Sequence, residues 1–254
     1  MARVGAVLRG TVRTVGELLV TFSVLTALFI VYQLYYTNLV GRQVMDDEVG
    51  AMHRQWTASA AAAPPAPPTP PVRSAATPPS PTAVPPATSG APAPQTAAPV
   101  AAPPSTPSAL LRNGSYVAIL HIPRLGSGAD GSGIPVLEGI GMDVLNKATG
   151  HYPGTALPGQ VGNFAVAGHR KTHGEPFRHL DELRAGDLVT VETAKAWFTY
   201  EIDADPVIVQ PSDVGVLAPV PGRSLITLTT CNPWWSSTQR MIVTGHLVSS
   251  RSRT

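Results

Sequence analysis

A stretch of low complexity, residues 57–110, divides this chain into two parts that have to fold separately. It contains 17 of the 27 prolines, and Arg73 is its only charged residue. Such a segment cannot bury enough apolar surface to offset the entropy lost on ordering. Proline instead favours extended polyproline II backbone, at about 3.1 Å per residue. We therefore expect a disordered Pro/Ala-rich linker that acts as a spacer and holds the following domain away from the preceding segment.

The part before the linker contains a long uncharged segment. No charge occurs from Leu18 to Tyr36, and at about 1.5 Å per residue this length can cross a hydrocarbon core of about 30 Å. Arginines precede the segment and acidic residues follow it, which predicts a cytoplasmic N-terminus. A cleaved signal peptide is the alternative, but the apolar run is long for one, and small-residue cleavage sites lie far beyond it.

These features predict the organisation of the first part of the chain. We expect a cytoplasmic tail at 1–14, an uncleaved transmembrane anchor at 15–37 and a juxtamembrane segment at 38–56. Within the last of these, apolar residues recur at spacings of four, three and four, which favours one face of a helix. They are Met45, Val49, Met52 and Trp56.

The part after the linker is long enough for one domain with its own core. From Arg112 onward it carries 12 Lys and Arg against 12 Asp and Glu, so it has no basic footprint for nucleic acid. Short β-prone segments separated by Gly and Pro turns predict an all-β closed barrel or sandwich. The predicted strands are 116–122, 134–138, 163–169, 188–192, 197–203, 207–210, 224–230 and 239–248, with helical candidates at 142–148 and 177–183.

Cys231 is the only cysteine in the chain, so it forms no internal disulfide. An unpaired cysteine in an exported domain indicates a reactive thiol, whereas a buried, inert cysteine is the common alternative. A catalytic thiol needs a base such as histidine and a fixed donor for the developing oxyanion. Cys231 follows one predicted strand and Arg240 begins the next, so both side chains could face one cleft.

Metal binding is a weaker interpretation. Four histidines fall close together in the sequence, but they lie in a strand-and-loop region without the helical spacing of a zinc motif. We expect neither a metal nor another cofactor. The histidines are His151, His169, His173 and His179.

The segment Thr227-Leu-Thr-Thr-Cys231-Asn-Pro, with Arg240 nine residues after the cysteine, resembles the active-site signature of sortases. These are cysteine transpeptidases of Gram-positive bacteria, and the likeness is closest to the class E sortases of actinobacteria. Residues 151–156, 158–163 and 164–170 resemble the family segment that leads to the catalytic histidine. The resemblance covers about 111–249. It implies a closed eight-stranded β-barrel with short helices at 111–250, followed by a tail at 251–254.

The resemblance also implies roles for single residues. Cys231 would be the nucleophile, His169 the general acid and base, and Arg240 the group that holds the oxyanion and substrate. His173 departs from the pattern, because an aromatic residue is expected there. Three flanking residues are expected to contact substrate: Thr230, Asn232 and Arg170.

By this resemblance the chain would be a membrane-anchored extracellular transpeptidase. It would cleave LAxTG or LPxTG sorting signals at the C-termini of surface proteins between Thr and Gly. The acyl chain would pass through a thioester to a cell-wall amine on a lipid II-type peptidoglycan precursor. A pilus-type sortase that polymerises subunits through a lysine amine, another Cys/His transpeptidase or peptidase, and a non-enzymatic stalked surface protein remain alternatives.

Overall fold

A computed structural model of the chain describes residues 2–62, 111–126 and 133–253. Most of the predicted linker, 57–110, lies outside the described residues. Its first residues are helical, because helix α1 runs without a break from Ala2 to Ala61. The start predicted for the linker at residue 57 is therefore wrong.

The described residues after the linker form one mixed sheet of parallel and antiparallel strands, which closes into a barrel. The strand order is β6-β5-β1-β2-β3-β4-β8-β9-β7, and β6 also pairs with β9. The closed barrel therefore has eight strands, with β7 added at the edge of β9, which confirms the predicted eight-stranded barrel. The strands are β1 Tyr116–His121, β2 Ile134–Glu138, β3 Thr149–His151, β4 Gly162–Ala167, β5 Leu188–Glu192, β6 Ala196–Ile202, β7 Val207–Val209, β8 Ser224–Asn232 and β9 Gln239–Ser252.

Short helices connect the strands, as expected. Helix α2, Met142–Leu145, lies inside the predicted helical segment 142–148. The other candidate, 177–183, contains only the 3₁₀ turn η3, Leu180–Glu182. Two further 3₁₀ turns are η2, Pro123–Leu125, and η4, Val214–Leu217.

Alternation along β4 and β8 separates the core from the outer face of the barrel. Phe164 and Val166 of β4 and Ile226 and Leu228 of β8 point inward and are fully buried in the main core. Successive side chains on a strand point to opposite faces. The odd-numbered residues of both strands therefore line the outer face, and Cys231 is one of them.

The strand predictions need four corrections. The strand predicted at 224–230 continues to Asn232, so Cys231 lies within β8 and not after it. β3, with the sequence Thr-Gly-His, was not predicted because it is too short to show alternation. The strand predicted at 163–169 ends at Ala167, which leaves His169 in the following loop. β9 runs to Ser252, and its last part pairs with β6. The first residues of the predicted tail at 251–254 therefore belong to a strand of the barrel wall.

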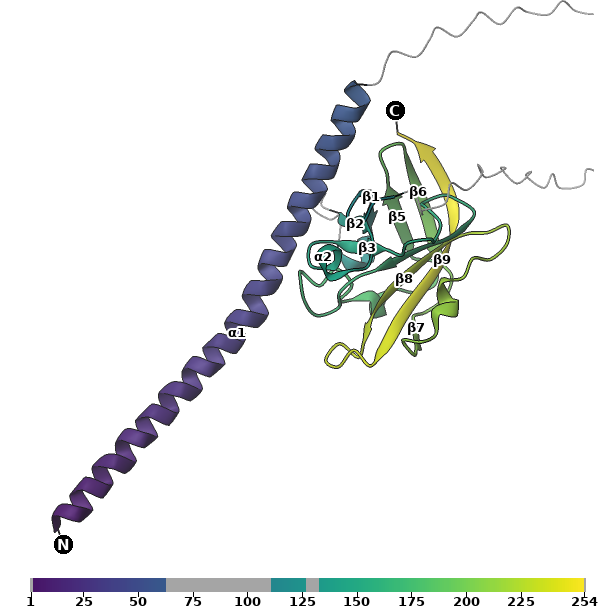
Figure 1. Ribbon diagram of the computed structural model, residues 1–254. Coiled ribbons are helices and arrows are strands. Elements are labelled where there is room, and N and C mark those ends of the chain that lie inside the picture. Colours follow the sequence, from purple (N-terminus) through teal and green to yellow (C-terminus); the bar gives the residue numbers. More distant parts are fainter. Residues whose placement is uncertain (1, 63–110, 127–132, 254) are drawn as a thin grey trace, which may run out of the picture.

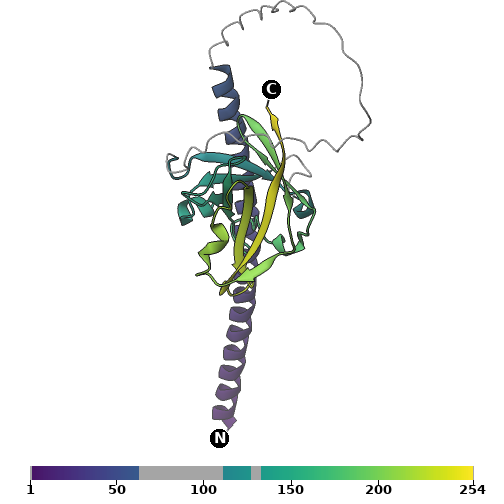
Figure 2. The same ribbon diagram turned by 90° about the vertical axis from the view of Figure 1, so that its right-hand side faces the viewer.

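Helix α1 lies beside the barrel over its C-terminal half, while its N-terminal half extends beyond the barrel (Figure 1; Figure 2). Among the described residues, α1 is the one helix that is both long enough and apolar enough to cross a membrane. The mean hydropathy of its most apolar window is 2.1. The large apolar side chains of the projecting half, such as Leu25 and Phe29, are more than half exposed. This half therefore presents an apolar surface that no part of the barrel covers.

The C-terminal half of α1 packs on the barrel through the predicted apolar face. Val49 and Met52 are buried against Ile119 of β1, and Trp56 completes this cluster. Polar contacts reinforce the packing: the Tyr116 hydroxyl donates to Glu48 Oε2 at 2.9 Å. His53 Nε2 lies 3.2 Å from Glu192 Oε1 of β5, and the Arg253 guanidinium lies 5.4 Å from the Trp56 ring centroid.

This packing corrects the expectation that residues 57–110 hold the domain at a distance. The barrel contacts α1 directly, beginning at Asn38, whose side chain donates to Glu175 at 2.6 Å. The linker therefore connects the end of α1 to a barrel that is already seated against that helix.

Replacing Met52 with alanine is expected to lower the free energy of unfolding by about 2–3 kcal/mol, because a fully buried methionine leaves a cavity when truncated. The matched control is Met142→Ala, whose side chain is 56% exposed. Chemical denaturation of the full chain in neutral detergent, followed by tryptophan fluorescence, measures both. Equal losses for the two variants would contradict the seating of α1 on the barrel.

Candidate active site

The register of β8 and β9 places Cys231 and Arg240 side by side. They are direct cross-strand partners in the antiparallel pair. Such partners point to the same face, with Cβ atoms about 4.5–5.5 Å apart. Both side chains are half-buried, so the thiol and the guanidinium share a position that substrate can reach.

The Arg240 side chain is held by backbone carbonyls of its own turn. Its Nη1 donates to the Ser237 carbonyl at 3.0 Å and to the Gln239 carbonyl at 2.8 Å. Among the described residues, no carboxylate lies within ion-pair distance of Arg240. The guanidinium is therefore oriented without being neutralised, and its other donors remain free for a developing negative charge.

His169 follows the end of β4, which pairs with the other side of β8. β4 pairs in parallel with β8, and Ala167 is the partner of Thr229. The Gly168 N–H donates to the Thr229 carbonyl at 3.0 Å, and the Thr230 hydroxyl donates to the Gly168 carbonyl at 2.7 Å. These bonds continue the pairing past the end of β4 to Gly168, the residue before His169.

The imidazole of His169 stacks on that of His173, with ring centroids 5.0 Å apart and an angle of 27° between the planes. Burial lowers the pKa of His169, and the nearby His173 lowers this pKa further. Nε2 of His169 and Nδ1 of His173 are buried without a hydrogen-bond partner among the described residues. Both causes favour the neutral form of the His169 imidazole.

The backbone of the loop after His169 is constrained by α1. His173, Gly174 and Glu175 all have positive φ, at 53°, 81° and 56°. A Cβ added to Gly41 of α1 would lie 2.3 Å from the Gly174 nitrogen, so the helix and the loop touch backbone to backbone. The helix thus fixes the loop that places His173 against His169.

Replacing His173 with phenylalanine should move the acid limb of the kcat/KM pH profile to higher pH. The ring stacking is kept, but the charge that lowers the pKa of His169 is removed, so this pKa rises towards its ordinary value. His179→Gln is the control, since His179 pairs with Glu182 at 2.8 Å in the same loop. An acid limb that stays in place in His173→Phe would contradict this coupling.

The comparisons with known proteins agree with this arrangement. Residues 120–248 match the family model described as Sortase domain. The chain belongs to the sortase family. Sortase SrtE1 of Streptomyces coelicolor is 32% identical over 255 residues, an alignment that covers 95% of this chain and 58% of the relative. The chain thus spans less than two thirds of that relative's length.

Two solved structures show the same barrel. The SrtA sortase from Actinomyces oris has a TM-score of 0.54 and 36% identity, over 60% of this chain and 89% of the other. Sortase E1 from Streptomyces coelicolor, solved with a tripeptide in its active site, has a TM-score of 0.50 and 42% identity, over 55% of this chain and 92% of the other. With SrtE1 among the relatives, the predicted likeness to class E sortases is confirmed.

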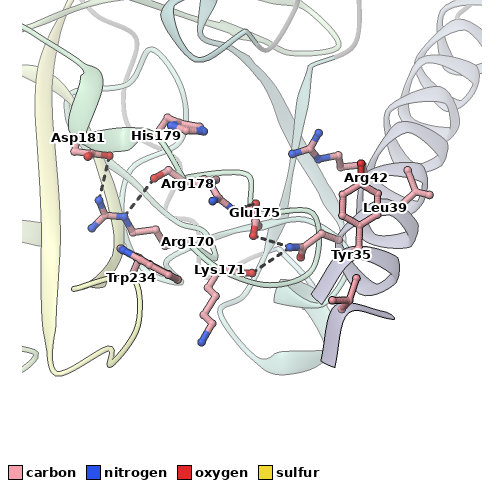
Figure 3. Close-up of a pocket in the computed structure, with 12 residues that line it drawn as sticks. Tyr35, Leu39, Arg42, Arg170, Lys171, Glu175, Arg178, His179, Asp181 and Trp234 are labelled. Carbon is pink, nitrogen blue, oxygen red and sulfur yellow. Dashed lines mark hydrogen bonds and ion pairs between the residues drawn. The ribbon is translucent and has the colours of Figure 1, made fainter. Parts of the chain in front are cut away.

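In this sortase, Arg170 joins the histidine loop to the cysteine strand. Its Nη1 donates to Asn232 Oδ1 at 2.6 Å, and its Nη2 lies 3.1 Å from Asp181 Oδ1. Its Nε donates to the Arg178 carbonyl at 3.3 Å, and the residue is only 8% exposed. Figure 3 shows Arg170 directed towards Asp181. The guanidinium is therefore occupied by protein groups.

Asn232 and Thr230 are engaged in a similar way. The Asn232 amide also donates to Gln239 Oε1 at 3.3 Å, and Thr230 is buried with its hydroxyl on the Gly168 carbonyl. We propose that Arg170, Asn232 and Thr230 position His169 and Cys231, while their contacts with substrate stay a prediction. Sequence reasoning identified these residues by proximity, and the hydrogen bonds show what each one holds.

Sequence reasoning missed two contributors to the site. Tyr152 places its hydroxyl 3.1 Å from Thr229 Oγ1 on the outer face of β8, and Gly41 braces the histidine loop. The other two clustered histidines serve elsewhere: His151 Nδ1 lies 2.6 Å from Glu138 Oε2 in a buried pair. The regular spacing of apolar residues in α1 indicates that one face of this helix packs against something. It does not show that the partner is the barrel.

Proposed function

We propose that this sortase is a cysteine transpeptidase that cleaves a C-terminal sorting signal of the LAxTG or LPxTG type between Thr and Gly. It would join the released protein to a cell-wall amine. The observation that supports this proposal is the cross-strand pairing of Cys231 with Arg240, together with the position of His169 just after β4, which pairs with the other side of β8. These three side chains together provide a nucleophile, a proton carrier and an oxyanion partner.

The first half of the reaction forms a thioester. The Cys231 sulfur attacks the threonine carbonyl carbon, and the carbonyl oxygen becomes an oxyanion that the free donors of Arg240 stabilise. His169, having taken the thiol proton, delivers it to the departing glycine nitrogen. The C–N bond breaks, and the acyl chain stays on the Cys231 sulfur.

The second half reverses the proton path. An acceptor amine attacks the thioester carbon, and His169 takes a proton from that amine. The oxyanion forms again beside Arg240, the C–S bond breaks, and the sulfur leaves as a thiolate that regains its proton. A lipid II-type peptidoglycan precursor is the acceptor that we propose, and surface proteins with sorting signals are the donors.

We further propose that residues 15–37 anchor the enzyme in the membrane, with residues 1–14 in the cytoplasm and the barrel outside the cell. The apolar, uncovered half of α1 supports the anchor. The distribution of arginines before it and acidic residues after it supports this orientation.

The test is to incubate the full chain in neutral detergent with an LAxTG peptide or an LPxTG peptide, with and without an amine acceptor such as diaminopimelate. Mass spectrometry of the products should show cleavage between Thr and Gly and, with acceptor, a new amide at the threonine. An intact peptide under all conditions, or cleavage at another bond, would overturn the proposal.

A further inference from the structure

A cavity of about 750 Å³ lies between α1 and the loop that follows His169. Figure 3 shows its two sides: Tyr35, Leu39 and Arg42 of α1 face Arg170, Asp181 and Trp234. Arg170 and Trp234 follow the catalytic His169 and Cys231 closely in the chain. The cavity is therefore adjacent to the active site but is not built from the three catalytic side chains.

The charges that line this cavity do not cancel. Its two carboxylates each have a cation: Asp181 lies 3.1 Å from Arg170, and Glu175 lies 2.6 Å from Arg178. The two other cations in the lining are Arg42 and Lys171. Within the described residues, neither has a carboxylate at ion-pair distance, and both are exposed. The cavity thus offers two uncompensated positive charges to an anion.

The position of the cavity along α1 is the second observation. Its wall runs from Val31 to Arg42, about 16 Å along the helix at 1.5 Å per residue. Val31 and Tyr35 belong to the proposed membrane span 15–37, whereas Arg42 lies beyond it. The cavity therefore lies across the extracellular boundary of the proposed membrane span. Its apolar wall is at the depth of the acyl chains, and Arg42 is at the depth of the lipid headgroups.

Two exposed tryptophans lie in the β8–β9 turn, and one of them faces the cavity. Trp234 lines the cavity, and Lys171 Nζ lies 6.0 Å from the centroid of its ring. Trp234 and Trp235 are 52% and 65% exposed, although they are large and apolar. Tryptophan is enriched where protein meets the membrane interface, so the β8–β9 turn is suited to contact with lipid.

We propose that this cavity binds the phosphate headgroup of an anionic membrane lipid, through Arg42 and Lys171, with the acyl chains along Val31, Tyr35 and Leu39. The inference rests on the proposed function in one respect, since it takes residues 15–37 as the membrane anchor. A bound lipid would clamp α1 to the loop that positions His169. The active site would then be held at the membrane surface.

The experiment uses the full chain in neutral detergent, titrated with phosphatidylglycerol and examined by native mass spectrometry. The wild-type chain should retain a lipid at its tightest site, and the double variant Arg42→Gln/Lys171→Gln should weaken this binding by roughly tenfold or more. The matched control is Arg54→Gln/Lys195→Gln, which removes an exposed arginine further along α1 and an exposed lysine of the β5–β6 turn.

Three outcomes would overturn the proposal. The first is unchanged lipid affinity in the Arg42/Lys171 variant, and the second is an equal loss in the control, which would indicate diffuse attraction. The third is displacement of the lipid by inorganic phosphate over the same concentration range, which would indicate a site for a free anion. Cleavage of a soluble sorting peptide should persist in the Arg42/Lys171 variant, so failure of lipid binding is distinguishable from failure of the transpeptidase proposal.

Discussion

Replacing Cys231 with alanine is expected to remove sorting-peptide cleavage by roughly 10⁴-fold or more, as found when a catalytic nucleophile is lost. No other thiol exists in the chain to substitute for it. In the proposed mechanism His169 transfers a proton and Arg240 stabilises charge, so neither takes over the role of the thiol as nucleophile. The rate of product formation and the mass of any trapped acyl-enzyme measure the effect.

The same experiment has an internal control for folding. Cys231 is half-buried at the outer face of β8, so a change to alanine removes little packing and should leave the unfolding midpoint nearly unchanged. Ser236→Ala, at an exposed position in the β8–β9 turn, should cleave peptide at the wild-type rate. Persistent cleavage in Cys231→Ala would exclude the thiol as nucleophile and, with it, the thioester pathway.

The common face of Cys231 and Arg240 was predictable because it depends on strand periodicity. Arg240 alternates with Ile242 and Thr244 on β9, and the structure pairs all three with odd-numbered residues of β8. The alternation of side chains along the two strands therefore indicates which face of the sheet carries Cys231 and Arg240. The resemblance supplied His169, since no local pattern indicates that β4 lies beside β8.

Longer-range features were not predictable in the same way. β3 has three residues, and its place between β2 and β4 depends on partners distant in the sequence. The apolar face of α1 was recognised from its spacing, but a helical stripe does not identify the surface that covers it. The linker composition favours a spacer, whereas contacts such as those of Asn38 and Met52 with the barrel show that α1 and the domain adjoin.

The role of His173 shows how a deviation from a family pattern can retain part of its function. An aromatic residue was expected at this position, and the imidazole of His173 stacks on His169 as an aromatic ring would. The difference is that this ring can also carry charge. The stacking expected of an aromatic residue is therefore present in this chain, while the pKa of His169 depends on its neighbour.

Replacing Arg240 with alanine is the second change with a large expected effect, a loss of about 10²–10³ in kcat, equivalent to about 3–4 kcal/mol of transition-state stabilisation. The guanidinium lies opposite Cys231, where negative charge develops on the substrate oxygen. Because that charge is greater in the transition state than in the bound peptide, kcat should fall more than KM rises. Steady-state kinetics on the full chain separates the two.

Arg240→Lys and Arg223→Ala distinguish this role from simple electrostatic attraction. Lysine keeps the charge but lacks the planar donors that the Ser237 and Gln239 carbonyls orient, so it should recover only part of the activity. Arg223 is exposed just before β8, and its loss changes the net charge equally without touching the site. Full activity in Arg240→Lys would show that charge alone suffices, whereas wild-type kcat in Arg240→Ala would remove Arg240 from the oxyanion role.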